Sequence, residues 1–392
     1  MTGESRKPWE EYQALYVHIP FCRQKCLYCD FASYAGFGEE KMHEYALAVC
    51  REIEQQADKA AMMADGATVY FGGGTPSLLP AEDMQMITDA LRRCGFWRQP
   101  AEATVEANPG TACAAKLEAL RRAGFDRISF GVQSLNDGEL RAIGRIHTAA
   151  EAAEAVELAR RAGFKRISAD LIYGLPGQTE ASLAETLEGV LALVLDHISV
   201  YGLIVEEGTP LEKLVGEGKL QLPDEDAAGN MYDYVQKRLK RAGFERYEIS
   251  NYARNGQQSL HNTVYWQYRP YMAFGAAACS FDGRRRRTAA EGVDEYIAAV
   301  NGAGEHLYIE ENLSEEELLE EFMFMGLRRS AGADLHEARE RFGTDVMERF
   351  GSSLQPFLDR KLAVYDEEKG RLRLTEQGMA LGNLIFEIFV NG

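Results

Sequence analysis

One short phrase recurs along this chain, and it marks the end of a helix followed by the start of a strand. Each copy combines basic residues, a glycine and a phenylalanine, and follows an amphipathic stretch. Arginines suit the negative carboxyl end of a helix, and glycine adopts the left-handed conformation that ends one. Repeated joints of this kind predict alternating helices and strands, and therefore a parallel sheet. The copies are Arg92-Arg-Cys-Gly95-Phe96, Arg121-Arg-Ala-Gly124-Phe125, Arg160-Arg-Ala-Gly163-Phe164 and Arg241-Ala-Gly243-Phe244.

Polar and glycine-rich segments follow the predicted strands. In parallel β/α barrels, functional residues gather where the strands end. A cysteine loop follows the first predicted strand and Gly72-Gly73-Gly74-Thr75-Pro76 follows the second, while Glu106, Gln133 and Asp170 lie on the next three. We therefore predict an α/β fold, a partial (β/α)6 barrel with a site on one rim. The predicted strands cover 15–19, 67–72, 103–108, 127–132, 167–173 and 197–203.

Three cysteines stand on one short loop with C-x3-C-x2-C spacing: Cys22, Cys26 and Cys29. Thiolates are the usual ligands of iron–sulfur clusters, and four of them close a [4Fe–4S] cube. Three leave one iron without a protein ligand, and that iron can bind a small molecule. Two alternatives stay open, a chance grouping in a tight loop and a zinc site completed by a distant fourth ligand.

Composition limits the partners and the compartment. The 392 residues carry a net charge of −18, which disfavours nonspecific binding to nucleic acid. The N-terminus is acidic without an apolar region, and the longest aliphatic run, 190–195, is too short to span a bilayer. Scattered cysteines beside a thiolate loop favour a reducing compartment. We expect a soluble, cytoplasmic protein without a transmembrane segment.

The regular pattern loosens after Pro210, which predicts three domains. They are a barrel over 1–210, a linker and barrel extension over 211–310, and a C-terminal domain over 311–392. In the last, two short strands around the polar turn 366–370, packed with helices, predict a winged-helix-like α+β module. Because the module is acidic, we expect it to cover the barrel or contact a protein rather than DNA.

The cysteine triplet, with the aromatic Tyr28 before its third member, resembles the signature of the radical S-adenosylmethionine (SAM) superfamily. The resemblance implies a TIM-like radical SAM barrel, a [4Fe–4S] cluster held by the three cysteines, and SAM bound beside the cluster. Glycine lets main chain approach a ligand, and arginine pairs bidentately with a carboxylate. The positions that match cofactor-binding ones are Tyr16, Tyr28, Gly73, Gly74, Thr75, Glu106, Gln133, Arg145 and Asp170.

Over nearly its whole length the chain is similar to the oxygen-independent coproporphyrinogen III oxidase branch of this superfamily, and most closely to its HemW-type heme chaperones. Oxidases typically carry another cysteine where this chain has Phe31, and a longer segment before the first strand. The chaperones show the H-N-x-x-Y-W motif of 261–266. Other matching segments are Tyr16-Val-His18-Ile-Pro-Phe-Cys22, Phe71-Gly-Gly-Gly-Thr-Pro-Ser77, Thr104-Val-Glu106-Ala-Asn-Pro-Gly110 and Asp170-Leu-Ile-Tyr173-Gly-Leu-Pro176.

The resemblance makes His261, Tyr265 and Trp266 candidates for binding heme. Histidine is a common proximal heme ligand, although a packed, hydrogen-bonded histidine is the alternative. The family commonly has a Gly-Ala-His-Ser run after this motif, where this chain has Cys279 in place of the histidine. Cys279 is therefore a further candidate, either as a thiolate ligand or as an inert small residue.

The leading hypothesis is a heme chaperone that binds a [4Fe–4S] cluster, SAM and heme, and passes heme to an acceptor such as a respiratory protein. One alternative is an oxidase that decarboxylates coproporphyrinogen III with a SAM-derived radical. Another is a radical SAM enzyme that acts on heme itself. Whether the chain is an enzyme stays open, and a homodimer is a further state that the sequence allows.

Overall fold

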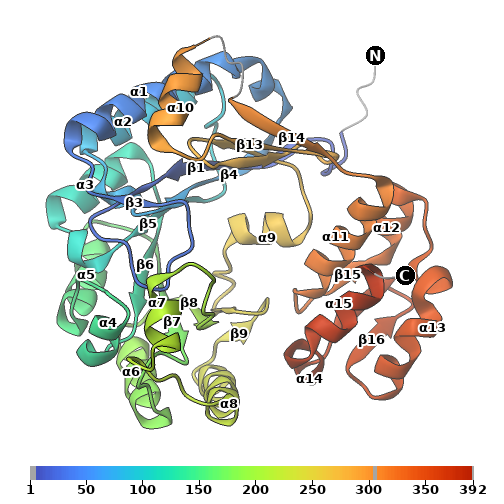
Figure 1. Cartoon of the computed structure of the whole chain (residues 1–392). Helices are drawn as coiled ribbons and strands as arrows, with labels where there is room; N and C mark the ends of the chain where they lie inside the picture. The colour runs from blue at the N-terminus through green and yellow to red at the C-terminus, as the bar shows by residue number, and fades with distance from the viewer. Residues whose placement is uncertain (1–5, 303–306, 391–392) are drawn as a thin grey trace.

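The computed structural model describes residues 6–302 and 307–390. Its centre is a 12-stranded sheet in which six consecutive parallel strands form the wall of an incomplete barrel (Figure 1). All six strands predicted from the sequence are present, and the predicted fold class is confirmed. They are β1 (Tyr12–Ile19), β4 (Met63–Gly73), β5 (Ala103–Ala107), β6 (Arg127–Gln133), β7 (Arg166–Tyr173) and β8 (His197–Gly202).

The wall continues beyond the predicted strands at both ends. On one side, β11 (Tyr271–Phe274) pairs in parallel with β1, although more than half of the chain separates them in sequence. Three antiparallel strands extend the sheet there: β12 (Cys279–Phe281), β13 (Arg285–Ala289) and β14 (Tyr308–Asn312). On the other side lie β10 (Asn251–Ala253) and β9 (Glu245–Arg246), while β2 (Phe21–Cys22) and β3 (Tyr34–Ala35) form a separate pair.

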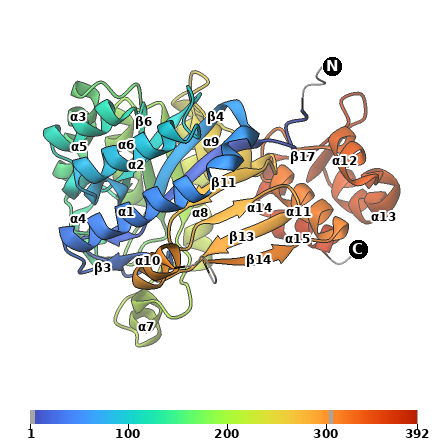
Figure 2. The same ribbon diagram turned by 90° about the horizontal axis from the view of Figure 1, so that it is seen from above.

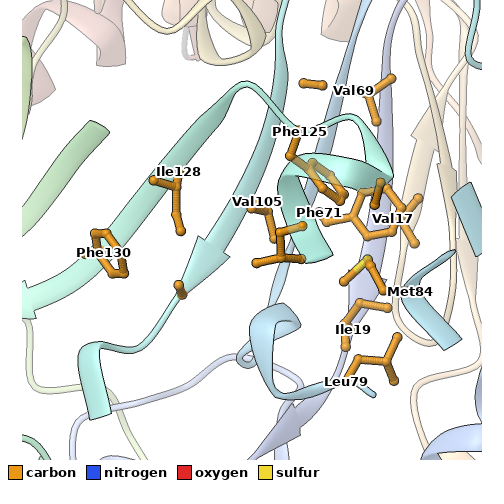
Figure 3. Close-up of a cluster of buried hydrophobic side chains, with 14 of the residues drawn as sticks. Val17, Ile19, Val69, Phe71, Leu79, Met84, Val105, Phe125, Ile128 and Phe130 are labelled. Carbon is orange, nitrogen blue, oxygen red and sulfur yellow. The ribbon is translucent and has the colours of Figure 1, made fainter. Parts of the chain in front are cut away.

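Helices cover the outer face of the barrel (Figure 2). Apolar side chains of the strands point outward to them, and Figure 3 shows Val69, Phe71 and Val105 packed near Phe125 and Met84. Because side chains alternate along a strand, the residues between these point into the barrel. The covering helices are α1 (Glu39–Gln55), α2 (Ala81–Arg93), α3 (Ala114–Ala123), α4 (Asp137–Ala142), α5 (Ala149–Arg161), α6 (Glu180–Ala192), α8 (Glu225–Arg241) and α10 (Val293–Asn301). The helix α7 (Pro210–Gly216) lies beside the cysteine loop instead, and 3-10 turns occur at Ala57–Met62, Pro76–Leu78 and Pro109–Thr111.

The recurring joints end their helices as the sequence predicts. At the second copy, Gly124 has a φ of 108°, its N–H donates to the carbonyl of Arg121, and the Phe125 N–H donates to the carbonyl of Leu120. This pair of bonds is the Schellman arrangement, which satisfies carbonyls at the helix end. The phenylalanines of all four copies are buried and their glycines all have positive φ.

The C-terminal module has its own core and its own small sheet of three strands, in the order β15-β17-β16. Figure 1 shows it to one side of the barrel, with the short helix α9 (Leu260–Trp266) between the barrel and α11. Two antiparallel strands around a polar turn, flanked by helices, give it the predicted winged-helix-like form. Its elements are α11 (Glu315–Leu327), β15 (Ala333–Asp334), α12 (Leu335–Phe342), α13 (Val346–Asp359), β16 (Ala363–Asp366), β17 (Arg371–Leu374), α14 (Glu376–Ala380) and α15 (Gly382–Val390).

Within residues 6–302 and 307–390, no helix is both long enough and apolar enough to cross a membrane.

The joints generate a prediction about stability. Gly163 has a φ of 89° and open space where a Cβ would lie, so Gly163→Ala adds backbone strain alone. We expect it to lower the free energy of unfolding by about 1–2 kcal/mol. The matched control is Gly229→Ala inside α8, also with open space, which should raise that free energy by about 0.5–1 kcal/mol. Urea unfolding followed by circular dichroism measures both, and an unchanged midpoint for Gly163→Ala would contradict the prediction.

Candidate functional site

The inner face of the barrel is polar. TIM barrels usually fill this space with branched apolar side chains, which pack it shut. Here Tyr70 of β4 lies opposite Tyr16 of β1 and Thr104 of β5. Further along β5, Glu106 lies opposite Ser129 of β6. Asp170 and Ser199 continue this face on the next two strands. Tyr16, Tyr70, Glu106 and Asp170 are each partly exposed, so this polar face is not sealed from solvent.

The cysteine loop lies at the carboxyl end of this polar interior. Its backbone is tied to the loop after α4, where the Leu27 N–H donates to the carbonyl of Ile143 at 3.0 Å. Tyr28 packs against a small apolar cluster that contains Ile143, Ile172 and Leu175. These contacts explain why an aromatic residue precedes the third cysteine. Its ring anchors the loop to β7 and α4, and burial raises the pKa of its phenol.

Each of the three thiols has a polar neighbour. The Thr75 hydroxyl donates to Cys22 Sγ at 3.7 Å, and the Ser33 hydroxyl lies 3.7 Å from Cys29 Sγ. Arg145 Nη1 donates to Cys26 Sγ at 3.3 Å. All three cysteines are free of disulfides and partly exposed, and burial raises the pKa of the Cys22 thiol. Donors directed at sulfur are typical of the surroundings of iron–sulfur clusters.

Gly73 and Gly74 lie where the cysteine loop crosses the end of β4. A Cβ on Gly73 would lie 2.5 Å from the His18 ring, and one on Gly74 would lie 2.7 Å from the carbonyl oxygen of Phe21. Glycine is therefore required for close packing of these two segments. The Gly74 and Thr75 N–H groups donate to the carbonyls of Ile19 and Phe21, which joins the two loops into one unit.

Two partly buried carboxyl groups face the interior. The Tyr70 hydroxyl donates to Glu106 at 2.6 Å, and the Gly73 N–H donates to it at 3.2 Å. Burial raises the pKa of Glu106 to about 7, the charge of Asp170 adds to the effect, and these two hydrogen bonds oppose it. Burial also raises the pKa of Asp170, against hydrogen bonds from Ser199 and Ser129. A carboxyl group with a pKa near neutrality can accept or donate a proton.

Arg145 and Gln133 meet at an irregularity of β6. The register shifts between Gly131 and Gln133, and Gln133 takes a φ of 65°. Arg145 donates to the carbonyl of Gly131 as well as to Cys26, and its buried Nε has no partner within residues 6–302 and 307–390. The guanidinium therefore connects the cysteine loop to the end of β6 and keeps one donor unused.

The heme candidates lie below this rim, on and around α9. His261 is only 1% exposed; its Nδ1 lies 2.8 Å from the Thr68 hydroxyl and its Nε2 lies 2.8 Å from the Tyr265 hydroxyl. Burial lowers the pKa of the imidazole to about 3, so it is neutral. Both nitrogens are thus occupied, and His261 has the contacts of a packed, hydrogen-bonded histidine. The partly exposed Cys279 lies beside Tyr271, whose ring contacts Tyr265 with centroids 4.7 Å apart.

The structure reveals two groups of functional residues that the sequence did not lead us to predict. The first is the set of polar side chains facing the interior, among them Tyr70 and Ser129, which every second position of the predicted strands would have indicated. The second is Glu102, completely buried, which accepts hydrogen bonds from the Leu260 and His261 N–H groups at 3.2 Å each. Glu102 also pairs with Arg127 at 3.5 Å and Arg166 at 3.1 Å. No local pattern connects it to α9, because 157 residues separate it from Ser259.

We compared the chain with protein families, with characterised proteins and with solved structures. Residues 16–190 match the model of the radical SAM superfamily, and residues 313–381 match that of the HemN C-terminal domain. The chain is 36% identical to the heme chaperone HemW of Bacillus subtilis, over 96% of this chain and 99% of that protein. It is 35% identical to the mitochondrial radical S-adenosyl methionine domain-containing protein 1 of Bos taurus, over 96% and 85%. The structure of coproporphyrinogen III oxidase (HemN) from Escherichia coli superposes with a TM-score of 0.84 at 24% identity, covering 98% of this chain and 91% of that one.

The pKa of Glu106 generates a prediction about pH. A carboxyl group whose pKa is higher in the folded chain binds protons preferentially there, so its stabilising contribution is lost as pH rises from about 4.5 through 7. Between pH 5 and 8, wild type should lose about 2 kcal/mol of stability relative to Glu106→Gln. Thermal unfolding of both ligand-free proteins across this range measures the difference. A constant difference would show that Glu106 titrates in its ordinary range.

Proposed function

Because the chain belongs to the radical SAM superfamily, in the family of the HemW heme chaperones, we propose that it binds heme and passes it to acceptor proteins. The observation that carries this proposal is the similarity to those chaperones over essentially the full length of both chains. The likeness to the oxidase structure bears on the fold alone. Phe31 stands where the oxidases typically carry their additional cysteine, which favours the chaperone over the oxidase. Its side chain is 71% exposed.

The residues at the rim fit the two cofactors that radical SAM proteins bind. Cys22, Cys26 and Cys29 would hold a [4Fe–4S] cluster, since they are free thiols on one anchored loop with donors directed at their sulfurs. Such a cluster supplies an iron that is open to a small ligand. For SAM, the unused Nε of Arg145 and the carboxyl groups of Glu106 and Asp170 offer a donor for its carboxylate and acceptors for its ammonium and hydroxyl groups. The remaining members of this proposed site are Tyr16, Tyr28, Gly73, Gly74, Thr75 and Gln133.

For heme, we propose a site on the α9 side of the interior. Tyr265, Trp266 and Cys279 are partly exposed there, so part of each side chain is accessible to a ligand. His261 becomes available to iron only if the Tyr265 hydroxyl moves, so we assign it the role of fixing α9 against Thr68. Cys279 is then the better candidate for an iron ligand, because it is partly exposed and its thiol makes only a long contact of 3.7 Å with the Ser280 carbonyl beside its contact with Tyr271.

The remaining parts of the proposal follow from the sequence. We place the protein in the cytoplasm, with a respiratory protein as an acceptor and with a homodimer as one state. We also divide it into a barrel over 1–210, an extension over 211–310 and a module over 311–392. The apolar core that lies mostly within residues 318–389 supports the last boundary, although Tyr268 and Phe281 of the extension also belong to that core.

The cluster assignment is tested by substitution. Anaerobic reconstitution of wild type should give about four irons per chain. Cys22→Ala, Cys26→Ala and Cys29→Ala should each lose most of that iron, whereas Cys113→Ala, an exposed cysteine outside the loop, should keep it. Iron analysis together with EPR, with and without SAM, measures both points. A full cluster in all three loop variants would refute the ligand assignment.

The chaperone assignment is tested with two tetrapyrroles. The reconstituted protein should bind heme, seen as a Soret band, and transfer it to an apo-cytochrome. Under anaerobic reducing conditions with SAM it should leave coproporphyrinogen III unchanged. Chromatography of the reaction detects any protoporphyrinogen, and its formation would replace the chaperone with the oxidase.

A further inference from the structure

Arg328, the residue that follows α11, is held between two aromatic rings where the barrel meets the module. Its guanidinium carbon lies 4.9 Å from the Trp266 ring centroid and 5.0 Å from that of Phe324. Trp266 ends α9, so the contact joins the last residue of the H-N-x-x-Y-W motif to the C-terminal module. Figure 1 shows α9 facing α11 across this junction.

Two buried donors at this junction have no hydrogen-bond partner. They are Arg328 Nε and Trp266 Nε1, and neither finds an acceptor anywhere in residues 6–302 or 307–390. Buried polar groups are nearly always satisfied, so two orphaned donors on stacked side chains call for an explanation. An acceptor that is not part of this chain provides one.

No carboxylate of residues 6–302 or 307–390 forms an ion pair with this guanidinium. Burial lowers the pKa of Arg328, and only the charge of Glu248 opposes that effect. The Glu248 carboxylate is itself buried and accepts the Ser250 N–H at 3.1 Å, and burial raises its pKa. Arg269 and Arg341, by contrast, both form ion pairs with Glu337. Arg328 is therefore a partly buried cation with unused hydrogen-bonding capacity, which favours an anionic partner.

We propose that Arg328 and Trp266 bind a carboxylate of a tetrapyrrole, with the guanidinium and the indole N–H as its donors. Guanidinium groups match carboxylates geometrically, and an indole N–H adds a neutral donor. Tyr265, next to Trp266 on α9, and its ring partner Tyr271 offer aromatic surface for a flat macrocycle. The inference rests on the proposed function and adds to it the group that recognises the propionates of heme.

The carboxylate of SAM is a second source of the same chemistry. It has a competing donor in Arg145, which contacts Cys26 in the cysteine loop. An experiment can distinguish the carboxylate of SAM from that of a tetrapyrrole. If the site binds the tetrapyrrole, variants of Arg328 should leave SAM binding unchanged.

The experiment compares heme with heme dimethyl ester, in which both carboxylates are blocked. Wild type, Arg328→Met, Trp266→Phe and the control Arg238→Met are titrated with each compound, and SAM binding is measured in parallel. Arg238 of α8 is a suitable control because it already forms an ion pair, with Glu188 of α6, and makes no hydrogen bond, ion pair or ring contact with Arg328 or Trp266 among residues 6–302 and 307–390. Trp266→Phe keeps an aromatic ring for packing, although a smaller one, and removes the N–H donor.

We expect wild type and Arg238→Met to bind heme about 10- to 100-fold more tightly than the ester. In Arg328→Met that preference should fall to within about threefold, and Trp266→Phe should lie between, with SAM binding unchanged in every variant. An undiminished preference in Arg328→Met would overturn the site while leaving heme binding intact. A loss of SAM affinity in Arg328→Met would assign the site to SAM instead. If wild type bound neither compound, the proposed function would fail and the site with it.

Discussion

The alternation of side chains along six parallel strands is the constraint on which the rest of this structure depends. One face of each strand, represented by Val69, Phe71 and Val105, is apolar and buried under helices. The other face is polar and lines the interior, so the barrel cannot be closed by hydrophobic packing. Polar groups there must be satisfied by one another, and the pairing of Tyr70 with Glu106 and of Ser129 with Asp170 meets that need.

The same requirement explains how α9 is held inside the fold. The buried carboxylate of Glu102 would be costly alone, but it is compensated by two arginines and by the first N–H groups of the helix. His261 is then fixed by Thr68 and Tyr265, and burial keeps its imidazole neutral. The motif that attracts attention in the sequence therefore owes its position to residues of β4 and to Glu102, far from it along the chain.

The predictable part of this fold is local. The joints around Gly124 and Gly163 depend on a few adjacent residues, so they mark helix ends and strand starts without tertiary information. The cysteine loop and the polar residues after each strand were likewise visible, because strand ends meet at one rim. Three features depended on distant contacts: the pairing of β11 with β1, the buried pairs of Glu102, and the occupied nitrogens of His261. A histidine in a motif carries no signal of how its ring will be hydrogen-bonded, and the contacts with Thr68 and Tyr265 decide this.

The pairing of β11 with β1 has a consequence for synthesis. Strand β1 emerges from the ribosome first, yet its neighbour on one side is residues 271–274, which are made only after two thirds of the chain. Until then the long edge of β1 is open, with its backbone groups available to another strand. A nascent chain of this protein therefore carries an exposed pairing edge for seconds at ordinary translation rates, and general chaperones that shield such edges should influence its yield more than its final stability.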